Sequence, residues 1–253
     1  MSEVKVDKIS PRSGTDVTLG DASDTFTIPA SATLDVNGTI DVTGATTTGF
    51  PSSGFSKWTP VTATDSTFDL QSGTTKVILE VQASGGTAGT NNGGGDNAGA
   101  GGAGAYAKKL LTGMTGATDK LNITIGAVAA AAASGTVTSV AQAGTASFTT
   151  VTCTGGAGGI AGGVEVSGGA GGALPTTGDL NIAGQNGTPS AAYGYTVGPG
   201  ANSMFGFGGR RVEGTNGEGK AASGYGAGGG QGRGASNPGG VGTAGLVIVW
   251  EYK

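Results

Sequence analysis

Gly155-Gly-Ala-Gly-Gly-Ile-Ala-Gly-Gly163 and Gly168-Gly-Ala-Gly-Gly-Ala173 come close to a three-residue repeat of residues with almost no side chain. Such chains can pack backbone against backbone, because no large side chain keeps them apart. In an extended conformation with three residues per turn, each chain can hydrogen-bond to several neighbours. Ordering glycine costs much backbone entropy, and many mutual backbone bonds must offset that cost. We therefore expect ordered packing of these tracts; the alternative is flexible glycine linkers.

Strand-like segments lie between the glycine tracts at 85–105, 155–173 and 224–245. They are Lys76-Val-Ile-Leu-Glu-Val-Gln82, Leu121-Asn-Ile-Thr-Ile125, Ala146-Ser-Phe-Thr-Thr-Val-Thr152 and Leu246-Val-Ile-Val-Trp-Glu-Tyr252. Their β-branched and aromatic residues favour extended backbone. The last segment is the most apolar of the chain, and we expect it to form a central strand although it lies at the C-terminus.

Residues 1–50 differ in composition from the rest. They hold five of the 55 glycines and carry seven acidic and three basic residues, which accounts for the whole net charge of −4. Apolar residues recur there in i, i+2 pairs, and turn residues separate the pairs, which are Val17/Leu19, Phe26/Ile28, Leu34/Val36 and Ile40/Val42. This period indicates strands, each too short for a stable sheet of its own. We expect the rungs of a trimeric rod, β-prism-like or β-helix-like; the alternative is a small β-meander packed on the rest of the chain.

The sequence thus predicts a mainly β protein in three parts. Residues 1–50 are the anchoring or shaft segment, 51–57 are a linker of small polar residues around Pro51, and 58–253 are a glycine-rich β head. In this head we expect the glycine tracts to be polyglycine-II-like.

Composition argues against several functions. The chain has no His, and its one cysteine, Cys153, has no partner for a disulfide, so we expect neither a metal site nor His-based catalysis. Thirteen basic against seventeen acidic residues give no basic footprint for nucleic acid. The start has no apolar region typical of a signal peptide, and no apolar run approaches the ~20 residues that span a bilayer. We expect no enzyme and no cofactor.

Two glycine motifs carry little weight in this composition. Gly99-Ala-Gly-Gly-Ala-Gly104 fits the dinucleotide fingerprint, but no βαβ pattern surrounds it. Gly214-Thr-Asn-Gly-Glu-Gly-Lys-Ala221 is nearly a phosphate-binding loop, but Ala221 stands where a hydroxyl should reach magnesium. We therefore do not expect nucleotide binding.

Aromatic residues between glycines are the candidate binding residues. They are Tyr193 and Tyr195, Phe205 and Phe207, and Tyr225, with Arg210 and Arg211 beside the second pair. Aromatic and arginine side chains on loops are the usual anchors of binding surfaces. The alternative is that the rings pack over glycine surfaces inside the head and that the arginines are plain solvated surface.

Several segments, taken in their order along the chain, carry a resemblance. They are Val77-Ile-Leu-Glu-Val-Gln-Ala-Ser-Gly-Gly86, Gly101-Gly-Ala-Gly-Ala-Tyr-Ala107, Ile123-Thr-Ile-Gly-Ala127, Gly144-Thr-Ala-Ser-Phe148, Thr154-Gly-Gly-Ala-Gly-Gly159, Tyr225-Gly-Ala-Gly-Gly-Gly230 and Gly242-Thr-Ala-Gly-Leu-Val-Ile-Val-Trp-Glu-Tyr252. With them, Trp58 to Lys253 resembles the glycine-rich distal domain of bacteriophage tail fibres and adhesins. Residues 4–42, especially Val6-Asp-Lys-Ile-Ser-Pro-Arg-Ser-Gly-Thr15, look like N-terminal segments of marine phage virion appendages.

The resemblance implies a virion appendage, assembled in the host cytoplasm, whose glycine-rich head recognises the host. Some such adhesins fold as a sandwich of polyglycine-II helices, and their distal loops set host range. The implied partners are two further copies of the chain, other tail proteins through residues 1–50, and a host surface glycan or outer-membrane protein. The alternatives are a structural or decorating virion protein and, disfavoured by the lack of a signal peptide pattern, a non-viral glycine-rich surface or ice-binding protein. One departure is Val128 followed by five alanines, where the family pattern usually continues with glycine and where a short helix is an alternative.

Overall fold

The computed structural model describes residues 54–91, 98–128, 130–162, 166–190, 197–212, 216–234 and 236–253. The chain divides into two compact units, 1–50 and 51–253, and the described residues all belong to the second. The trimeric rod expected for residues 1–50 therefore lies outside the described residues. Within the described ranges, no helix is long and apolar enough to cross a membrane.

The described part of the chain is built from antiparallel strands, which confirms the mainly β prediction. The strands are β1 (Phe55–Val61), β2 (Asp65–Asp69), β3 (Lys76–Gln82), β4 (Tyr106–Thr112), β5 (Asp119–Thr124), β6 (Thr138–Gly144), β7 (Val151–Cys153), β8 (Leu180–Ile182), β9 (Phe205–Phe207), β10 (Ser223–Tyr225) and β11 (Leu246–Tyr252). Strand β1 begins inside the segment 51–57 that the sequence suggested as a linker, because Phe55 pairs with Tyr252.

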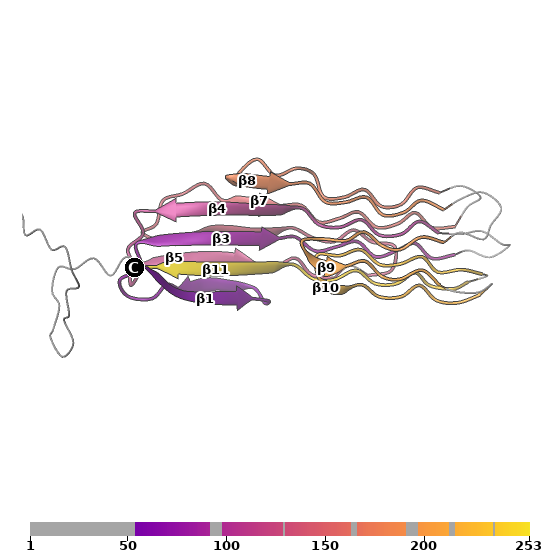
Figure 1. The fold of residues 1–253 in the computed structure, drawn as a ribbon, viewed down its shortest axis with the longest axis horizontal. Helices are drawn as coiled ribbons and strands as arrows, with labels where there is room; N and C mark the ends of the chain where they lie inside the picture. Colours follow the sequence, from indigo (N-terminus) through magenta and orange to yellow (C-terminus); the bar gives the residue numbers. More distant parts are fainter. Residues whose placement is uncertain are drawn as a thin grey trace, which may run out of the picture. The chain divides into compact units, whose positions relative to one another are not determined.

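Two sheets pack face to face (Figure 1). One has the strand order β1-β11-β3-β4-β8 and the other β2-β5-β6-β7; β9 and β10 form a separate two-stranded ribbon. Strand β11 pairs with β1 on one side and with β3 on the other, with Val249 opposite Leu79. The prediction that the C-terminal segment is a central strand is confirmed.

The core lies between the two sheets and follows the alternation of the strands. Val77, Leu79 and Val81 of β3 are fully buried, and the residues between them face outward. They pack with buried residues of the second sheet, among them Leu121 and Ile123 of β5. A continuous apolar layer of this kind is the main source of stability for a sandwich.

Two sequence expectations need correction. Of the predicted strand 146–152 only Val151 and Thr152 belong to a strand, β7, whereas the unpredicted segment Thr138–Gly144 pairs with β5 along six positions as β6. The small, weakly apolar side chains of β6 gave no strand signal, and its pairing partner decides its conformation. In the alanine run, the described residues form a turn with Ala132 at φ 57°, and none is helical.

Cys153 is buried in this core, and its thiol donates a hydrogen bond of 3.3 Å to the carbonyl oxygen of Val81. Burial raises the pKa of Cys153 to about 12. The folded protein therefore keeps a neutral thiol at neutral pH.

We predict that a thiol reagent such as DTNB labels Cys153 at pH 8 only after unfolding. Because the folded-state pKa is raised above the unfolded value, stability contributed by the neutral thiol is complete below about pH 8.5 and declines as pH rises toward 12. Denaturant melts between pH 8 and 11 should show this decline, and Cys153→Ala should reduce it. Rapid labelling under native conditions would contradict the prediction.

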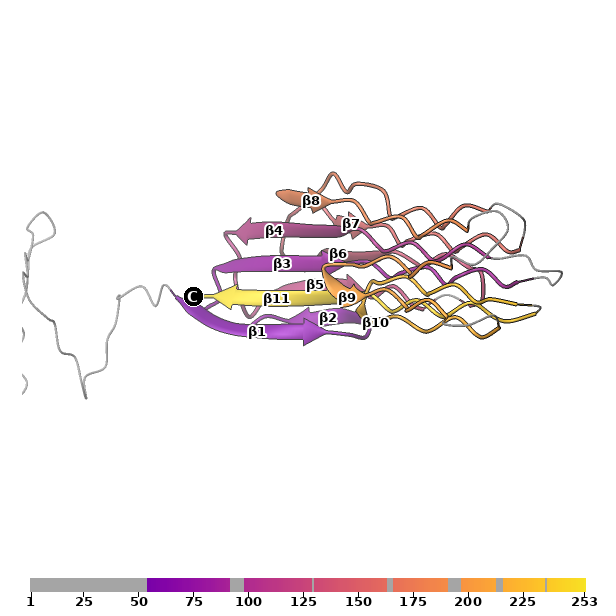
Figure 2. The same ribbon diagram turned by 45° about the vertical axis from the view of Figure 1, so that its right-hand side comes forward.

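Beyond the sheets, the glycine tracts run side by side (Figures 1 and 2). The N–H groups of the tract 99–104 donate to three neighbouring tracts in strict rotation. Gly99, Ala100 and Gly101 donate to the carbonyl oxygens of Ile160, Thr188 and Gly229, and Gly102, Ala103 and Gly104 donate to those of Ala157, Gln185 and Gly226. Each donor–acceptor distance is between 2.9 and 3.1 Å. Each of the three neighbouring tracts thus accepts a hydrogen bond from every third residue of the tract 99–104.

The carbonyl oxygens of the same tract point to three other neighbours. They accept from Gly89 and Gly86 in one tract, from Gly169 and Gly172 in a second, and from Ala201 in a third. This tract is therefore surrounded by six others, three that accept from it and three that donate to it. A β-strand, with its period of two, hydrogen-bonds to only two neighbours.

The close approach of the tracts leaves no room for side chains at many glycines. A Cβ atom on Gly101 would lie 2.0 Å from the carbonyl oxygen of Gly86, and one on Gly156 would lie 2.1 Å from that of Gly102. Both distances are far inside van der Waals contact. Glycine is required at these positions by the neighbouring backbone.

We predict that Gly156→Val destabilises the protein by about 3 kcal/mol or more, because the added side chain must separate the tracts and break their hydrogen bonds. Gly54→Val is the matched control, since a Cβ at Gly54 meets nothing within 4 Å. Thermal and denaturant melts measure both. If Gly156→Val melts like the wild type, the tracts do not pack as described.

Candidate functional site

The ribbon of β9 and β10 brings three of the predicted binding residues together. Phe205 lies opposite Tyr225, and Phe207 lies opposite Ser223. Figure 1 shows the ribbon beside the ends of the strands of the five-stranded sheet, where the glycine tracts begin. These two segments are 16 residues apart in the sequence, and their pairing was not predicted from it.

The glycines on both sides of Tyr225 set the shape of the ribbon. Gly224 has φ +77° and Gly226 has φ +75°, in the left-handed region that other residues rarely adopt. A Cβ on Gly226 would also lie 2.5 Å from Nε2 of Gln82. The ribbon is thereby held tightly against the end of β3.

The rings of the ribbon differ in their surroundings. Phe207 is 74% exposed, whereas Phe205 is half-buried with its ring centroid 5.9 Å from that of Tyr106. Tyr225 is half-buried as well. Phe205 therefore fits the alternative of an internal packing ring, and Phe207 is free to contact a partner.

We predict that Phe205→Ala lowers the free energy of unfolding by about 1–3 kcal/mol, through lost burial and lost contact with Tyr106. Phe207→Ala, its matched control on the same strand, should change that free energy by less than about 0.5 kcal/mol. Thermal denaturation of the two variants measures the difference. Equal melting temperatures would show that the two rings do not have these separate roles.

The other predicted binding residues lie apart from the ribbon or outside the described residues. Arg210 and Arg211 are exposed in the tract that follows β9. Tyr193 and Tyr195 lie outside the described residues.

The tract ends next to the undescribed segments are held beside one another. The N–H of Gly162 donates to Thr90, that of Asn91 donates to Asn237, and that of Ser190 donates to Val166, over 2.9–3.2 Å. Each of these residues stands within two positions of a stretch that lies outside the described residues. In Figure 2 the tract ends lie at the end of the head opposite the C-terminus.

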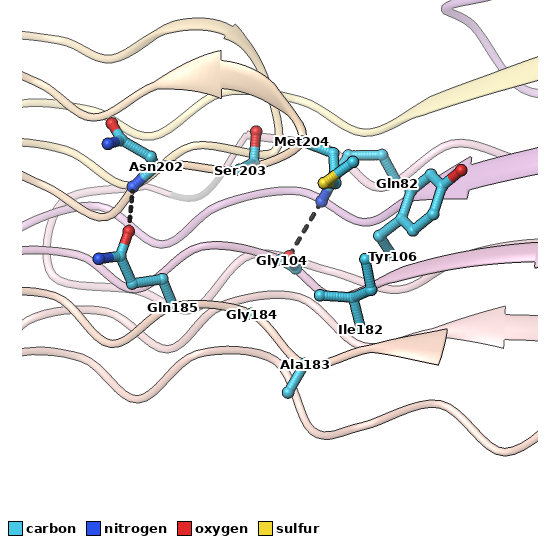
Figure 3. Close-up of a pocket in the computed structure, with 10 residues that line it drawn as sticks. All are labelled: Gln82, Gly104, Tyr106, Ile182, Ala183, Gly184, Gln185, Asn202, Ser203 and Met204. Atoms are coloured by element: carbon cyan, nitrogen blue, oxygen red, sulfur yellow. Dashed lines mark hydrogen bonds between the residues drawn. The ribbon is translucent and has the colours of Figure 1, made fainter. Parts of the chain in front are cut away.

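A cavity of about 280 Å³ lies next to the ribbon and was not predicted from the sequence (Figure 3). Its larger side chains are those of Gln82, Tyr106, Ile182, Gln185, Asn202 and Met204, from strand ends and tract starts. None of the side chains that line it is charged. These residues lie between Gln82 and Met204 in the sequence, and no local motif marks them.

The polar groups of the cavity are oriented by backbone partners. Gln82 is fully buried, and its Nε2 donates to the carbonyl oxygen of Gly104 over 2.9 Å, while its Oε1 has no hydrogen-bond partner in the protein. Gln185 and Asn202 are exposed, and their side-chain oxygens accept from the N–H groups of Asn202 and Gly208. Figure 3 shows their NH₂ groups pointing away from Gln82, Ile182 and Met204.

Tyr106 is fixed in the cavity wall by Glu80. Its hydroxyl donates to Oε2 of Glu80 over 2.9 Å, and Nε1 of Trp250 donates to Oε1 of the same carboxylate over 3.0 Å. Burial, reinforced by the hydrogen bond to Glu80, raises the pKa of Tyr106 above its ordinary value. The phenol therefore stays neutral, and its ring keeps one orientation.

Comparison of the sequence with protein-family models and with curated proteins finds no match.

Proposed function

We propose that the protein is a receptor-binding adhesin of a bacteriophage tail fibre, whose glycine-rich head contacts the host cell surface. In this proposal residues 1–50 trimerise and dock to other tail proteins, and the receptor is a glycan or an outer-membrane protein. The observation that carries the proposal is the rotation of backbone hydrogen bonds along the tract 99–104. It supports the reading of the tracts as polyglycine-II-like helices, the architecture implied by the resemblance to phage adhesins.

The packing of the tracts suits a binding head. The tracts are joined by backbone hydrogen bonds and consist largely of Gly and Ala, so the scaffold has few side chains with which to bind a partner. Binding residues must then stand on the segments that connect the tracts, or on the ribbon of β9 and β10. Loops on a rigid scaffold are the usual carriers of recognition.

Aromatic stacking is the interaction best suited to this head. Phe207 is exposed on the ribbon, and Tyr193 and Tyr195 stand in the sequence between Ser190 and Val197. Residues 51–253 have ten acidic and ten basic residues, so long-range charge attraction is weak. We infer that shape and ring contacts dominate recognition.

A second candidate function is that of a structural or decorating virion protein. It is favoured by the outer face of the large sheet, where Trp58, Trp250, Ile78 and Leu110 lie opposite one another in a row across four strands. Trp58 is 51% and Leu110 is 48% exposed, and the two indole rings stack at 5.9 Å. An apolar row of this kind suits an apolar surface of another virion protein.

We predict that fluorescently labelled full-length protein adsorbs to strains within a bacterial panel. Replacing Tyr193, Tyr195 and Phe207 together by Ala should weaken adsorption by about thirtyfold or more while the fold remains intact. Raising the salt concentration should change it little, because uncharged ring contacts are not screened. Trp58→Ala is the matched control for loss of an exposed ring.

The outcomes separate the two functions. Adsorption lost in the triple variant and kept in Trp58→Ala supports the adhesin. Adsorption of the folded triple variant at the wild-type level would end the aromatic hypothesis, and a steep salt dependence would shift attention to Arg210, Arg211 and Arg233. A wild-type protein that adsorbs to no strain but binds purified virions through Trp58 would support the structural function instead.

A further inference from the structure

The outer face of the five-stranded sheet carries a cluster of large apolar side chains that are accessible in a single chain. Phe55 and Trp58 are more than half exposed, and Leu110 is nearly half exposed. Trp250 and Ile78 lie between Trp58 and Leu110 in the pairing of the strands. Contiguous apolar surface of this kind marks a site of contact with another molecule.

The aromatic side of this face is rigid before any partner binds. Nε1 of Trp250 donates to Glu80 over 3.0 Å, and the rings of Trp58 and Phe55 both lie 5.9 Å from that of Trp250. We call Phe55, Trp58 and Trp250 the aromatic ridge. Rings that are already fixed lose little conformational freedom when they are buried, and tryptophan is common among the anchors of interfaces.

The opposite side of the same face is hollowed. A cavity of about 240 Å³, which we call the hollow, is lined by Ile78, Lys108, Leu110, Asp179 and Leu180. Its charged groups already have partners, since Lys108 lies 3.7 Å from Glu80 and Asp179 accepts from Lys109 over 2.7 Å. An apolar ring that fills the hollow therefore leaves no charge buried without a partner.

The ridge of one chain cannot fill its own hollow. Strands β1 and β8 are the two edges of the sheet (Figure 1), so four strand spacings, or about 19 Å, separate the outer strand of the ridge from that of the hollow. A ring in the hollow must come from another molecule. The ridge of a second copy supplies rings that fit it.

The size of the face favours a tethered copy over a free partner. The ribbon occupies one end of the face, where Phe205 packs on Tyr106. The rest is about 19 Å wide and about 15 Å long, or roughly 300 Å². Stable interfaces between free proteins bury about 800 Å² on each partner. This face alone is too small to hold two free molecules together.

The chain itself supplies a tether. Residues 1–50 form a unit of their own, and only residues 51–53 stand between it and Gly54, whose N–H donates to the carbonyl oxygen of Lys253 over 3.0 Å. If three copies associate through residues 1–50, as proposed above, so short a linker keeps the heads at a local concentration on the order of millimolar. A small apolar face is then enough to join them.

The width of the face also fits three copies. Three sheets about 19 Å wide, set as the sides of a triangle around a threefold axis parallel to the strands, each lie about 5–6 Å from that axis. This is close to half the ~10 Å at which two sheets pack face to face. At each corner of the triangle, the ridge of one copy meets the hollow of the next.

We propose that the outer face of the five-stranded sheet is an interface between three copies of this chain, in which the aromatic ridge of each head fills the hollow of the next. The inference rests on the proposed function for the association of residues 1–50. It assigns to the chain itself the apolar row from Trp58 to Leu110 that otherwise favours a contact with another virion protein.

Disulfide cross-linking of the full chain tests this contact. Trp58→Cys and Leu180→Cys are introduced together, and within one chain these positions are far beyond the ~7 Å that a disulfide spans, so any bond between them joins two copies. Mild oxidation should give a covalent trimer on a non-reducing gel, and each single variant should remain a monomer there. Trp58→Cys with Ile160→Cys is the matched control, because Ile160 is as exposed as Trp58 but stands in a glycine tract. The native Cys153 is buried.

Tryptophan fluorescence reports on the same face, because the sequence has two tryptophans and both belong to the ridge. In Trp250→Phe the signal comes from Trp58 alone, and acrylamide should quench it at least threefold less in the native than in the unfolded protein. Adding Leu110→Glu puts a charge at the hollow and should raise the quenching at least twofold. Leu174→Glu, at an exposed position that does not line the hollow, should leave it unchanged. Light scattering should give the mass of three chains for every variant.

The outcomes separate this interface from the proposed function. A mass of three chains without cross-linking, or equal quenching with and without Leu110→Glu, would overturn the interface and leave association through residues 1–50 standing. A covalent dimer would overturn the threefold arrangement. A monomer whose Trp58 becomes protected only when purified virions are added would overturn the proposal and assign the face to another virion protein. A covalent trimer that adsorbs to no strain would support the interface and end the adhesin proposal.

Discussion

The packing of backbone on backbone between glycine tracts is the constraint on which the rest of the head depends. The tract 99–104 has no side chain larger than that of alanine, and it exchanges hydrogen bonds with six neighbours. Each bond contributes only about 1 kcal/mol net, and glycine loses much entropy when it is ordered. Such a lattice is stable only if it is extensive, because every tract needs neighbours on most sides to satisfy its donors and acceptors.

The sandwich of strands provides the register from which this lattice starts. Gln82 is the last residue of β3 and pairs with Tyr106, the first residue of β4; one step further, Ala83 still donates to Ala105 over 2.9 Å. From Ser84 onward the segment also bonds to other tracts: Ser84 accepts from Gly156, and Thr87 donates to Ala133. In the sandwich, side chains alternate between the core and the outer face every two residues, and this alternation aligns the chains. In the glycine tracts that continue these chains, the hydrogen-bond partners repeat every three residues. Neither part explains the stability of the head without the other.

The sequence allowed the periodic parts of this structure to be predicted and left the non-periodic parts open. The apolar runs around Leu79 and Val249 mark their strands, because burial and β-branching act locally. Strand β6 has no such signal, and its conformation follows from pairing with β5. For the candidate site, the flanking glycines singled out Phe205 and Tyr225 in the sequence, but the contact of Phe205 with Tyr106 depends on residues 99 positions apart. The same holds for the cavity, whose residues come from four separate segments.

The position of the cavity follows from the change of period itself. Strands stand in two sheets about 10 Å apart with side chains between them, whereas glycine tracts approach to backbone contact in all directions. The cavity lies on the outer face of the large sheet, because Gln82, Tyr106 and Ile182 lie opposite one another on the face turned away from Val81 and the core. Gln82, Tyr106 and Ile182 stand at strand ends, and Gly104, Gly184 and Gln185 stand in tracts, so the cavity lies at this transition. A scaffold that packs mainly through its backbone can therefore still form a recessed site with polar and apolar walls. The site lies where strand packing and tract packing meet.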